Sequence, residues 1–223
     1  MNLVEAAQTL DGLGLMPGQS GNLSERLARG FLITPSALPY DAMTEGDLVK
    51  LDLAGGRLGG RRKPSSEWRL HAAIYAARPD ALAIVHTHSP RATALACARR
   101  AIPPFHYMIA LAGGEDIRCS AYATFGTQEL ADAAVAALEG RRACLLANHG
   151  AVAIGRNLRE ALTLAREVEN LASLYLDMLA ARVDPVPLSE AEMAAVRARF
   201  EQHGQGGLRI GFAGQPLALG GPG

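Results

Sequence analysis

Two histidines stand two residues apart at the end of an apolar run, in the segment Ile84–His88. Alternate residues of a β-strand point to the same face of a sheet. In a strand, His86 and His88 would therefore face the same way, and both imidazoles could bind one metal ion from a single rigid element. This pair constrains the chain more than any other feature, because it predicts both a β-strand at these residues and metal binding by their side chains.

A third histidine, His149, follows a second apolar run, and the triplet Asn148–Gly150 is expected at the turn of a hairpin formed by residues 143–147 and 151–154. Three imidazoles at strand ends, with an acidic residue in reserve, are a common way to hold a catalytic metal with an open position. The pattern predicts an enzyme that uses the metal as a Lewis acid.

The acidic residue of interest is Glu67, near the start of a helix expected over 65–77, for which Ser65 or Ser66 is a natural N-cap. One interpretation is a first-turn glutamate stabilised by the helix dipole. The other is a carboxylate that ligates the metal and, when displaced, acts as a general base. His71 lies four residues later on the same helical face, and we interpret it as a structural histidine.

Three small polar segments offer hydroxyl and backbone N–H groups, namely Gly21-Asn22, Thr34-Pro35-Ser36 and Ser65-Ser66. Each alone is explained by capping or turn formation. Hydroxyls and free N–H groups at a helix N-terminus are also the elements of an anion site. Together with a metal site, they predict a phosphorylated substrate.

The composition excludes several classes of partner. The formal net charge of the 223 residues is zero, which gives no electrostatic case for binding nucleic acid or a membrane surface. No segment approaches the length of a membrane span, and the N-terminal residues lack the pattern of a secretory signal. The three cysteines, Cys97, Cys119 and Cys144, fit small buried side chains in a reducing cytoplasm. Only two residues are lysine, which disfavours Schiff-base chemistry.

Helical and strand patterns interleave along the chain. We expect a single domain over 1–203, an α/β fold with helices packed on a mixed, mostly antiparallel sheet, and a loosely ordered Gly-rich tail over 204–223. The expected strands are 23–27, 31–34, 48–53, 82–87, 107–112, 116–121, 143–147 and 151–154. The expected helices are 2–15, 65–77, 90–100, 127–138, 158–180 and 189–202, with Thr127 and Asn157 as N-caps.

The chain resembles the class II aldolase/adducin family. The similar segments run in family order across about residues 15–180 and are 20–24, 32–36, 63–69, 85–88, 102–110, 122–127 and 148–150. The resemblance implies a three-layer α/β/α sandwich, assembled as a homotetramer with active sites between subunits. It implies cleavage of a phosphorylated ketose to dihydroxyacetone phosphate and an aldehyde through a zinc-stabilised enediolate, with Mn²⁺ or Co²⁺ as other usable metals.

The resemblance also assigns residues. His86, His88 and His149 would hold the metal, with Glu67 as the resting fourth ligand and as the catalytic base. Tyr107 would reach the neighbouring subunit's site and protonate the aldehyde oxygen, while Phe125 would line the aldehyde side. The phosphate would be bound by Gly21, Asn22, Ser36, Ser65 and Ser66.

Two departures from the family pattern bear on the substrate. Ala37 adds a methyl group where a glycine usually lets the backbone approach the phosphate, and no tyrosine follows Tyr175 to cover the aldehyde. Alternative family activities are a pentulose-5-phosphate 4-epimerase, a sugar-acid phosphate decarboxylase and a thioribulose-phosphate dehydratase. A non-enzymatic adducin-like domain is disfavoured, because such domains lose the metal histidines and this chain has all three.

Overall fold

The computed structural model describes residues 1–203, with side chains described as far as Phe200. The tail expected over 204–223 lies outside the described residues. No helix in the described part has both the length and the apolar character that crossing a membrane requires.

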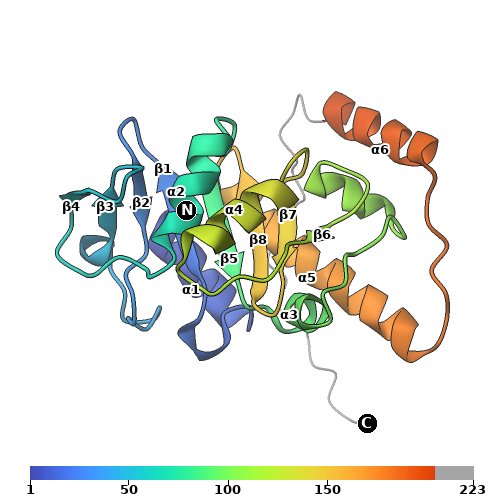
Figure 1. Cartoon of the computed structure of the whole chain (residues 1–223), viewed down its shortest axis with the longest axis horizontal. Helices are drawn as coiled ribbons and strands as arrows, with labels where there is room; N and C mark the ends of the chain where they lie inside the picture. The colour runs from blue at the N-terminus through green and yellow to red at the C-terminus, as the bar shows by residue number, and fades with distance from the viewer. Residues whose placement is uncertain (204–223) are drawn as a thin grey trace, which may run out of the picture.

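One eight-stranded sheet forms the centre of the structure (Figure 1). Its strands, in the order β4-β3-β2-β1-β5-β8-β7-β6, pair antiparallel throughout except for the parallel pair β6–β7. The prediction of a mixed, mostly antiparallel sheet is confirmed. The strands are β1 (Asn22–Arg26), β2 (Phe31–Ile33), β3 (Val49–Leu51), β4 (Arg57–Gly59), β5 (Ala83–Thr87), β6 (Arg118–Cys119), β7 (Ala143–Leu146) and β8 (Gly150–Gly155).

Helices cover both faces of the sheet and give it two separate cores (Figure 1). The alternation of β5 shows the division, because Ala83 and Val85 belong to one core and Ile84 to the other. One face carries α1 (Leu3–Gly12), α3 (Pro90–Cys97) and α5 (Leu158–Ala180), and the other carries α2 (Trp68–Ala77) and α4 (Gln128–Ala137). The short helices are η1 (Pro17–Gln19), η2 (Glu45–Asp47) and η3 (Tyr107–Ala112), and α6 (Glu190–His203) lies against η3.

Side-chain caps begin two of the helices where the sequence predicts them. The Thr127 hydroxyl accepts a hydrogen bond from the backbone N–H of Leu130, 3.3 Å away. The Asn157 side chain accepts one from the N–H of Glu160 at 2.9 Å. Each cap satisfies one of the backbone donors that a helix N-terminus leaves unpaired.

The strand expected over 107–112 is wrong, since these residues form the 3₁₀ helix η3. His106 Nδ1 accepts a hydrogen bond from the N–H of Met108, and Gly113 ends the helix with a left-handed φ of 89°. The segment 109–112 is buried throughout. A short apolar run that is buried on all sides has no periodicity to separate a strand from a helical turn, so the sequence alone misassigned it.

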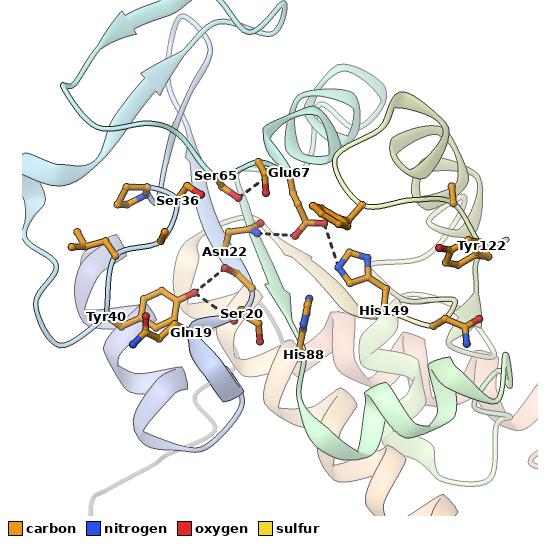
Figure 2. A pocket seen from close by; sticks show the side chains of 18 residues that line it. Gln19, Ser20, Asn22, Ser36, Tyr40, Ser65, Glu67, His88, Tyr122 and His149 are labelled. Carbon is orange, nitrogen blue, oxygen red and sulfur yellow. Dashed lines mark hydrogen bonds and ion pairs between the residues drawn. The ribbon is translucent and has the colours of Figure 1, made fainter.

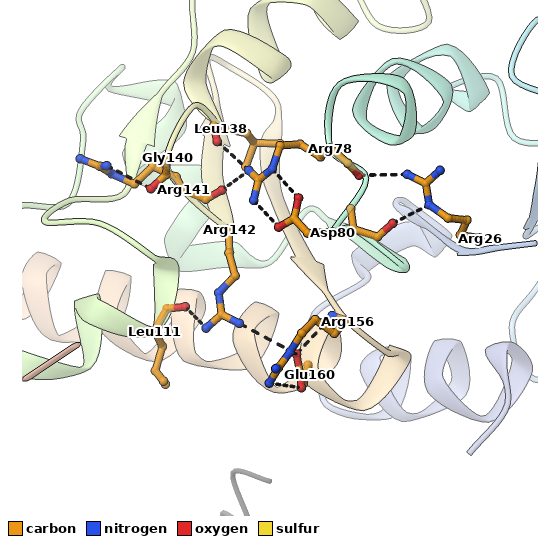
Figure 3. A network of polar contacts seen from close by, with 11 residues as sticks. Arg26, Arg78, Asp80, Leu111, Leu138, Gly140, Arg141, Arg142, Arg156 and Glu160 are labelled. Carbon is orange, nitrogen blue, oxygen red and sulfur yellow. Dashed lines mark hydrogen bonds and ion pairs between the residues drawn. The ribbon is translucent and has the colours of Figure 1, made fainter. Parts of the chain in front are cut away.

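Arginine side chains connect the elements at one end of the sheet, where β5 begins and β8 ends (Figure 3). The Arg78 guanidinium donates to the carbonyls of Leu138 at 2.9 Å and Arg141 at 2.5 Å, and it pairs with Asp80. It therefore ties the end of α2 to the turn between α4 and β7. His86, near the end of β5, and His88, just beyond it, lie toward the opposite end of the sheet.

Replacing Arg78 with Ala is expected to lower the free energy of unfolding by about 1.5–3 kcal/mol, because two carbonyls lose a charged donor. Urea unfolding followed by circular dichroism measures the change. Arg156→Ala is the matched control. That side chain is 68% exposed and pairs with Glu160 at the surface, so its loss should cost no more than about 0.5 kcal/mol. Equal losses in the two variants would contradict the bridging role.

Candidate active site

Three histidine side chains converge at the end of the β5–β8 pair, and Figure 2 shows two of them, His88 and His149. His86 is fully buried on β5, and His88 lies one residue beyond the strand. His149 occupies the β7–β8 turn, directly after Asn148, whose φ is 55°. The Nε2 atoms of His86 and His88 are 3.1 Å apart, and each pair of the three rings has centroids 4.8–4.9 Å apart.

Close backbone approach brings the two strand ends together. A Cβ atom on Gly150 would lie 2.3 Å from the carbonyl oxygen of Thr87 and 3.0 Å from the His88 ring. A larger residue at this position would push β8 away from the end of β5. The requirement for glycine next to His149 is a local feature that the sequence analysis did not use.

Glu67 completes the group from the opposite side. The expected serine cap is wrong, because α2 begins at Trp68 and Glu67 occupies the N-cap position without a side-chain cap bond. The Ser65 hydroxyl instead accepts from the N–H of Glu67, 3.3 Å away. Only 6% of Glu67 is exposed, and its carboxylate points toward the histidines rather than toward its own helix.

The carboxylate oxygens of Glu67 contact two of the imidazoles. Oε2 lies 3.1 Å from His86 Nε2 and Oε1 lies 3.3 Å from His149 Nε2. The Asn22 side-chain amide donates to Oε2 at 3.0 Å. One potential ligand atom from each of Glu67 and the three histidines lies within 4.8 Å of the others.

The hydrogen-bond partners of these side chains suit a bound cation. His86 Nδ1 donates to the carbonyl oxygen of Ala151 at 2.9 Å, so the lone pair of its Nε2 points at Glu67 and His88. Glu67 Oε1 is buried and has no hydrogen-bond partner. Lone pairs that face one another in a buried site require a shared positive charge, and three nitrogens with one oxygen match a divalent metal with an open position.

The pKa directions show that Glu67 and the three imidazoles act on one another electrostatically. Burial acts to raise the pKa of Glu67, but His86, His149 and the Asn22 hydrogen bond outweigh it and hold the pKa below its usual range. Burial acts to lower the pKa of His86, yet Glu67 raises it overall. Burial and the neighbouring imidazoles lower the pKa of His88 and of His149 to about 4. These two side chains are therefore neutral near pH 7, as metal ligands must be.

A cavity of about 390 Å³ opens beside Glu67, His88 and His149 (Figure 2). It brings together all five residues expected at the phosphate, and Phe125 also lines it. Asn22 and Ser65 are buried, whereas Phe125 is 65% exposed at the rim. The five are Gly21, Asn22, Ser36, Ser65 and Ser66.

Ala37 also lines the cavity, with a left-handed φ of 55°. This conformation is one that glycine adopts freely and alanine rarely does. The structure therefore keeps, at Ala37, the backbone geometry that a glycine would favour.

Several cavity residues were not found from the sequence. Tyr40 is 4% exposed, and its hydroxyl donates to the carbonyl oxygen of Gly21 at 2.8 Å, which supports the loop before β1. Tyr122 forms part of the rim and is 55% exposed. Tyr40 lies outside the segments that carry the family resemblance, whereas Tyr122 begins one of them, 122–127, in which only Phe125 was assigned a role. The others are Gln19, Ser20, Pro35, Leu38, Ala123 and Asn148.

Tyr107 does not line this cavity. It begins η3 and is 49% exposed, and its ring is tilted against that of His106 with the centroids 4.8 Å apart. The structure thus separates it from the other candidate catalytic residue, Glu67.

Comparison with known proteins gives the family. Residues 1–176 match the family described as Class II Aldolase and Adducin N-terminal domain. A 5-methylthioribulose-1-phosphate/5-deoxyribulose-1-phosphate aldolase of Rhodospirillum rubrum is 52% identical over 202 residues, covering 91% of this chain and 90% of the relative. An L-fuculose phosphate aldolase of Escherichia coli K12 is 48% identical over 209 residues, covering 93% and 95% respectively.

A solved structure of an L-fuculose 1-phosphate aldolase superimposes with a TM-score of 0.86 at 42% identity, covering 89% of this chain and 94% of that one. The chain belongs to the class II aldolase and adducin family. The family resemblance inferred from the sequence is confirmed, with L-fuculose phosphate aldolases among the similar relatives and solved structures, and the α/β fold is confirmed as well.

Replacing His86 with Ala is expected to remove bound divalent metal from the purified protein, because this imidazole is held by Ala151 with its lone pair toward the centre. Elemental analysis after dialysis measures the metal content per chain. His106→Ala is the control, since His106 lies outside the four-residue group and should leave the metal content unchanged. Full metal content in the His86 variant would exclude His86 as a ligand.

Proposed function

We propose that this protein is a metal-dependent aldolase that cleaves a ketose 1-phosphate, similar to L-fuculose 1-phosphate, to dihydroxyacetone phosphate and an aldehyde. The observation that carries the proposal is the buried Glu67 carboxylate facing three imidazoles at the wall of a polar cavity. Three nitrogen ligands and one displaceable oxygen favour Zn²⁺ as the resident metal, with Mn²⁺ or Co²⁺ as alternatives.

The metal, when bound, supplies a Lewis acid that stabilises negative charge on the substrate oxygens during carbon–carbon bond cleavage. Glu67 is the base of the reaction. In the synthetic direction its carboxylate removes a proton from the hydroxymethyl carbon of dihydroxyacetone phosphate and becomes a carboxylic acid. Cleavage is the reverse, so Glu67 must first take up a proton, which it then delivers to the carbon that becomes the hydroxymethyl group. The low pKa of Glu67 keeps the carboxylate ionised near pH 7.

Neutral donors bind the phosphate in this proposal. Apart from the histidines, the cavity is lined by no basic side chain of the described residues, so hydroxyl and N–H groups must supply the contacts. Ser36 and Ser66 offer hydroxyls that reach the cavity, and Ser65 lies beside Glu67. The phosphate side would use Gly21, Asn22, Ser36, Ser65 and Ser66.

The other wall of the cavity favours an apolar end of the sugar. Ala123 and Phe125 stand there with Tyr122, and these side chains offer mainly apolar surface. The relative from Rhodospirillum rubrum is named for substrates with a 5-methylthio or 5-deoxy carbon. We therefore propose three candidate substrates: L-fuculose 1-phosphate, a 5-deoxy ketose 1-phosphate and a 5-methylthio ketose 1-phosphate.

Tyr107 would act from a neighbouring subunit, as the family resemblance implies. It is half exposed and lies outside the cavity of its own chain, which fits a side chain used in another chain's site. In this proposal a homotetramer in the cytoplasm places Tyr107 against the aldehyde oxygen, where its hydroxyl donates the proton in the synthetic direction.

The direct test is release of dihydroxyacetone phosphate, followed by a coupled dehydrogenase. L-fuculose 1-phosphate, 5-deoxyribulose 1-phosphate and 5-methylthioribulose 1-phosphate are each given to the zinc-loaded protein with and without a chelator. Release that the chelator abolishes is the expected result. A zinc-loaded protein that cleaves none of the three would overturn the proposal and direct assays to epimerisation, decarboxylation and dehydration.

Glu67→Gln should lower kcat by at least about 100-fold, because an amide cannot accept the proton, while substrate binding persists. Isothermal titration with a non-cleavable phosphorylated analogue measures the binding. Glu25→Gln is the control, since Glu25 lies on β1 outside the cavity and should keep kcat. Normal turnover in the Glu67 variant would refute the base assignment.

Tyr107→Phe should slow cleavage by about 100-fold, the lower range for loss of a general acid, with unchanged metal content. Mixing this variant with Glu67→Gln tests the neighbouring-subunit role. Mixed tetramers contain some sites with both native residues and should regain activity. No recovery after subunit exchange would place the two residues in the same chain's site.

A further inference from the structure

A helix and a strand present matched pairs of polar side chains behind the candidate metal site. His71 and Tyr75 are four residues apart on α2, and Asn22 and Ser24 are two residues apart on β1. Four helical residues rise about 6 Å, and two strand residues span about 6.6 Å. The two spacings agree, so both side chains of α2 can form hydrogen bonds with the side chains of β1.

The four side chains and Glu67 form one continuous hydrogen-bonded row. The Tyr75 hydroxyl is 2.7 Å from Ser24 Oγ, and Ser24 Oγ is 2.6 Å from His71 Nδ1. His71 Nε2 is 2.5 Å from Asn22 Oδ1, and Asn22 Nδ2 is 3.0 Å from Glu67 Oε2. Each of the five residues is at least nine-tenths buried, so water does not substitute for a missing partner.

The charge of Glu67 sets the direction of every bond in the row. An ionised carboxylate only accepts, so Asn22 must turn its NH₂ group toward Glu67 and its oxygen toward His71. His71 Nε2 must then carry the hydrogen, which leaves Nδ1 as an acceptor. Ser24 therefore donates to Nδ1, and the Tyr75 hydroxyl donates to Ser24. No member of the row is left with two hydrogens or two lone pairs facing each other.

We propose that His71 is a positioning residue, which as a neutral Nε2–H imidazole locks the Asn22 amide with its NH₂ group toward Glu67 and so holds the carboxylate in place. If the ring carried its hydrogen on Nδ1, the Nε2 lone pair would face the oxygen of Asn22. The amide would then turn over and present that oxygen to Glu67 Oε2. The attraction between the Asn22 amide and the Glu67 carboxylate would then become repulsion between two oxygen atoms.

Burial keeps the ring neutral in support of this arrangement. It lowers the pKa of His71 to about 3, with a smaller contribution from His86, and Glu67 opposes the shift only in part. The row therefore differs from a carboxylate–histidine pair that exchanges a proton. It fixes an orientation and stores no charge.

The proton position can be measured without any assay of activity. The metal-free protein, labelled with ¹⁵N in its six histidines, gives two-bond ¹H–¹⁵N spectra that distinguish the two neutral tautomers and the imidazolium. His71→Gln assigns the signal. A neutral Nε2–H tautomer at pH 7 is the expected result. An Nδ1–H tautomer or an imidazolium at His71 would overturn the proposal.

The kinetic arm rests on the proposed aldolase function and uses two variants at one position. His71→Gln can keep a donor toward Asn22 Oδ1, whereas His71→Leu fills similar space without one. Loss of a residue that orients a metal ligand typically costs about 10–100-fold in activity or metal affinity. We expect His71→Leu to lower kcat and to raise the Zn²⁺ dissociation constant by this factor, with little change in KM. In His71→Gln both values should return most of the way to those of the wild type.

Tyr75→Phe is the matched control, because it removes only the first donor and leaves Ser24 able to donate to His71. Its kcat should stay within about twofold of the wild-type value, because in this proposal only the hydrogen bonds made by Asn22 orient Glu67. All variants are compared at equal folded fraction by circular dichroism. If kcat fell equally in His71→Leu and His71→Gln, or fell as far in Tyr75→Phe, His71 would have a role in core packing alone. A wild-type protein without aldolase activity but with the Nε2–H tautomer would overturn the proposed function and leave the positioning of Glu67 standing.

Discussion

The buried carboxylate of Glu67 is the constraint on which the rest of the site depends. Removing such a charge from water costs several kcal/mol unless partners replace the lost hydration. In this structure the lost hydration of Glu67 is replaced by the imidazoles of His86 and His149 and by the side-chain amide of Asn22. One oxygen, Oε1, still lacks a hydrogen-bond partner, which suits the group to binding a cation.

The sheet supplies the rigidity that this electrostatic arrangement requires. Strand β5 lies between β1 and β8, so one element carries His86 while its neighbours carry Asn22 and the turn that holds His149. Glycine at position 150 permits the close approach of β8. At the other end of the sheet the arginine network ties helix ends to strand ends (Figure 3), so both ends of the central strands are fixed.

The candidate substrate side is less constrained than the metal side. The hydroxyls and backbone of three loops surround the cavity, and the exposed rings of Tyr122 and Phe125 form its rim. The candidate metal centre is thus formed by side chains that are mostly buried, whereas the candidate substrate side has exposed rings at its rim. The names of the relatives, which include both fuculose phosphate and methylthioribulose phosphate aldolases, agree with this division between a fixed centre and a variable rim.

The sequence by itself determined the strand of His86 and His88, the hairpin around His149, the caps Thr127 and Asn157, and the family, because these depend on local spacing and on motifs in fixed order. Only the tertiary structure decided that 107–112 is helical, that Glu67 begins its helix with its charge turned inward, and that His71 reaches Asn22. Burial and contacts between distant segments control these features. A buried charge takes its partners from whichever elements surround it, and local sequence does not encode them.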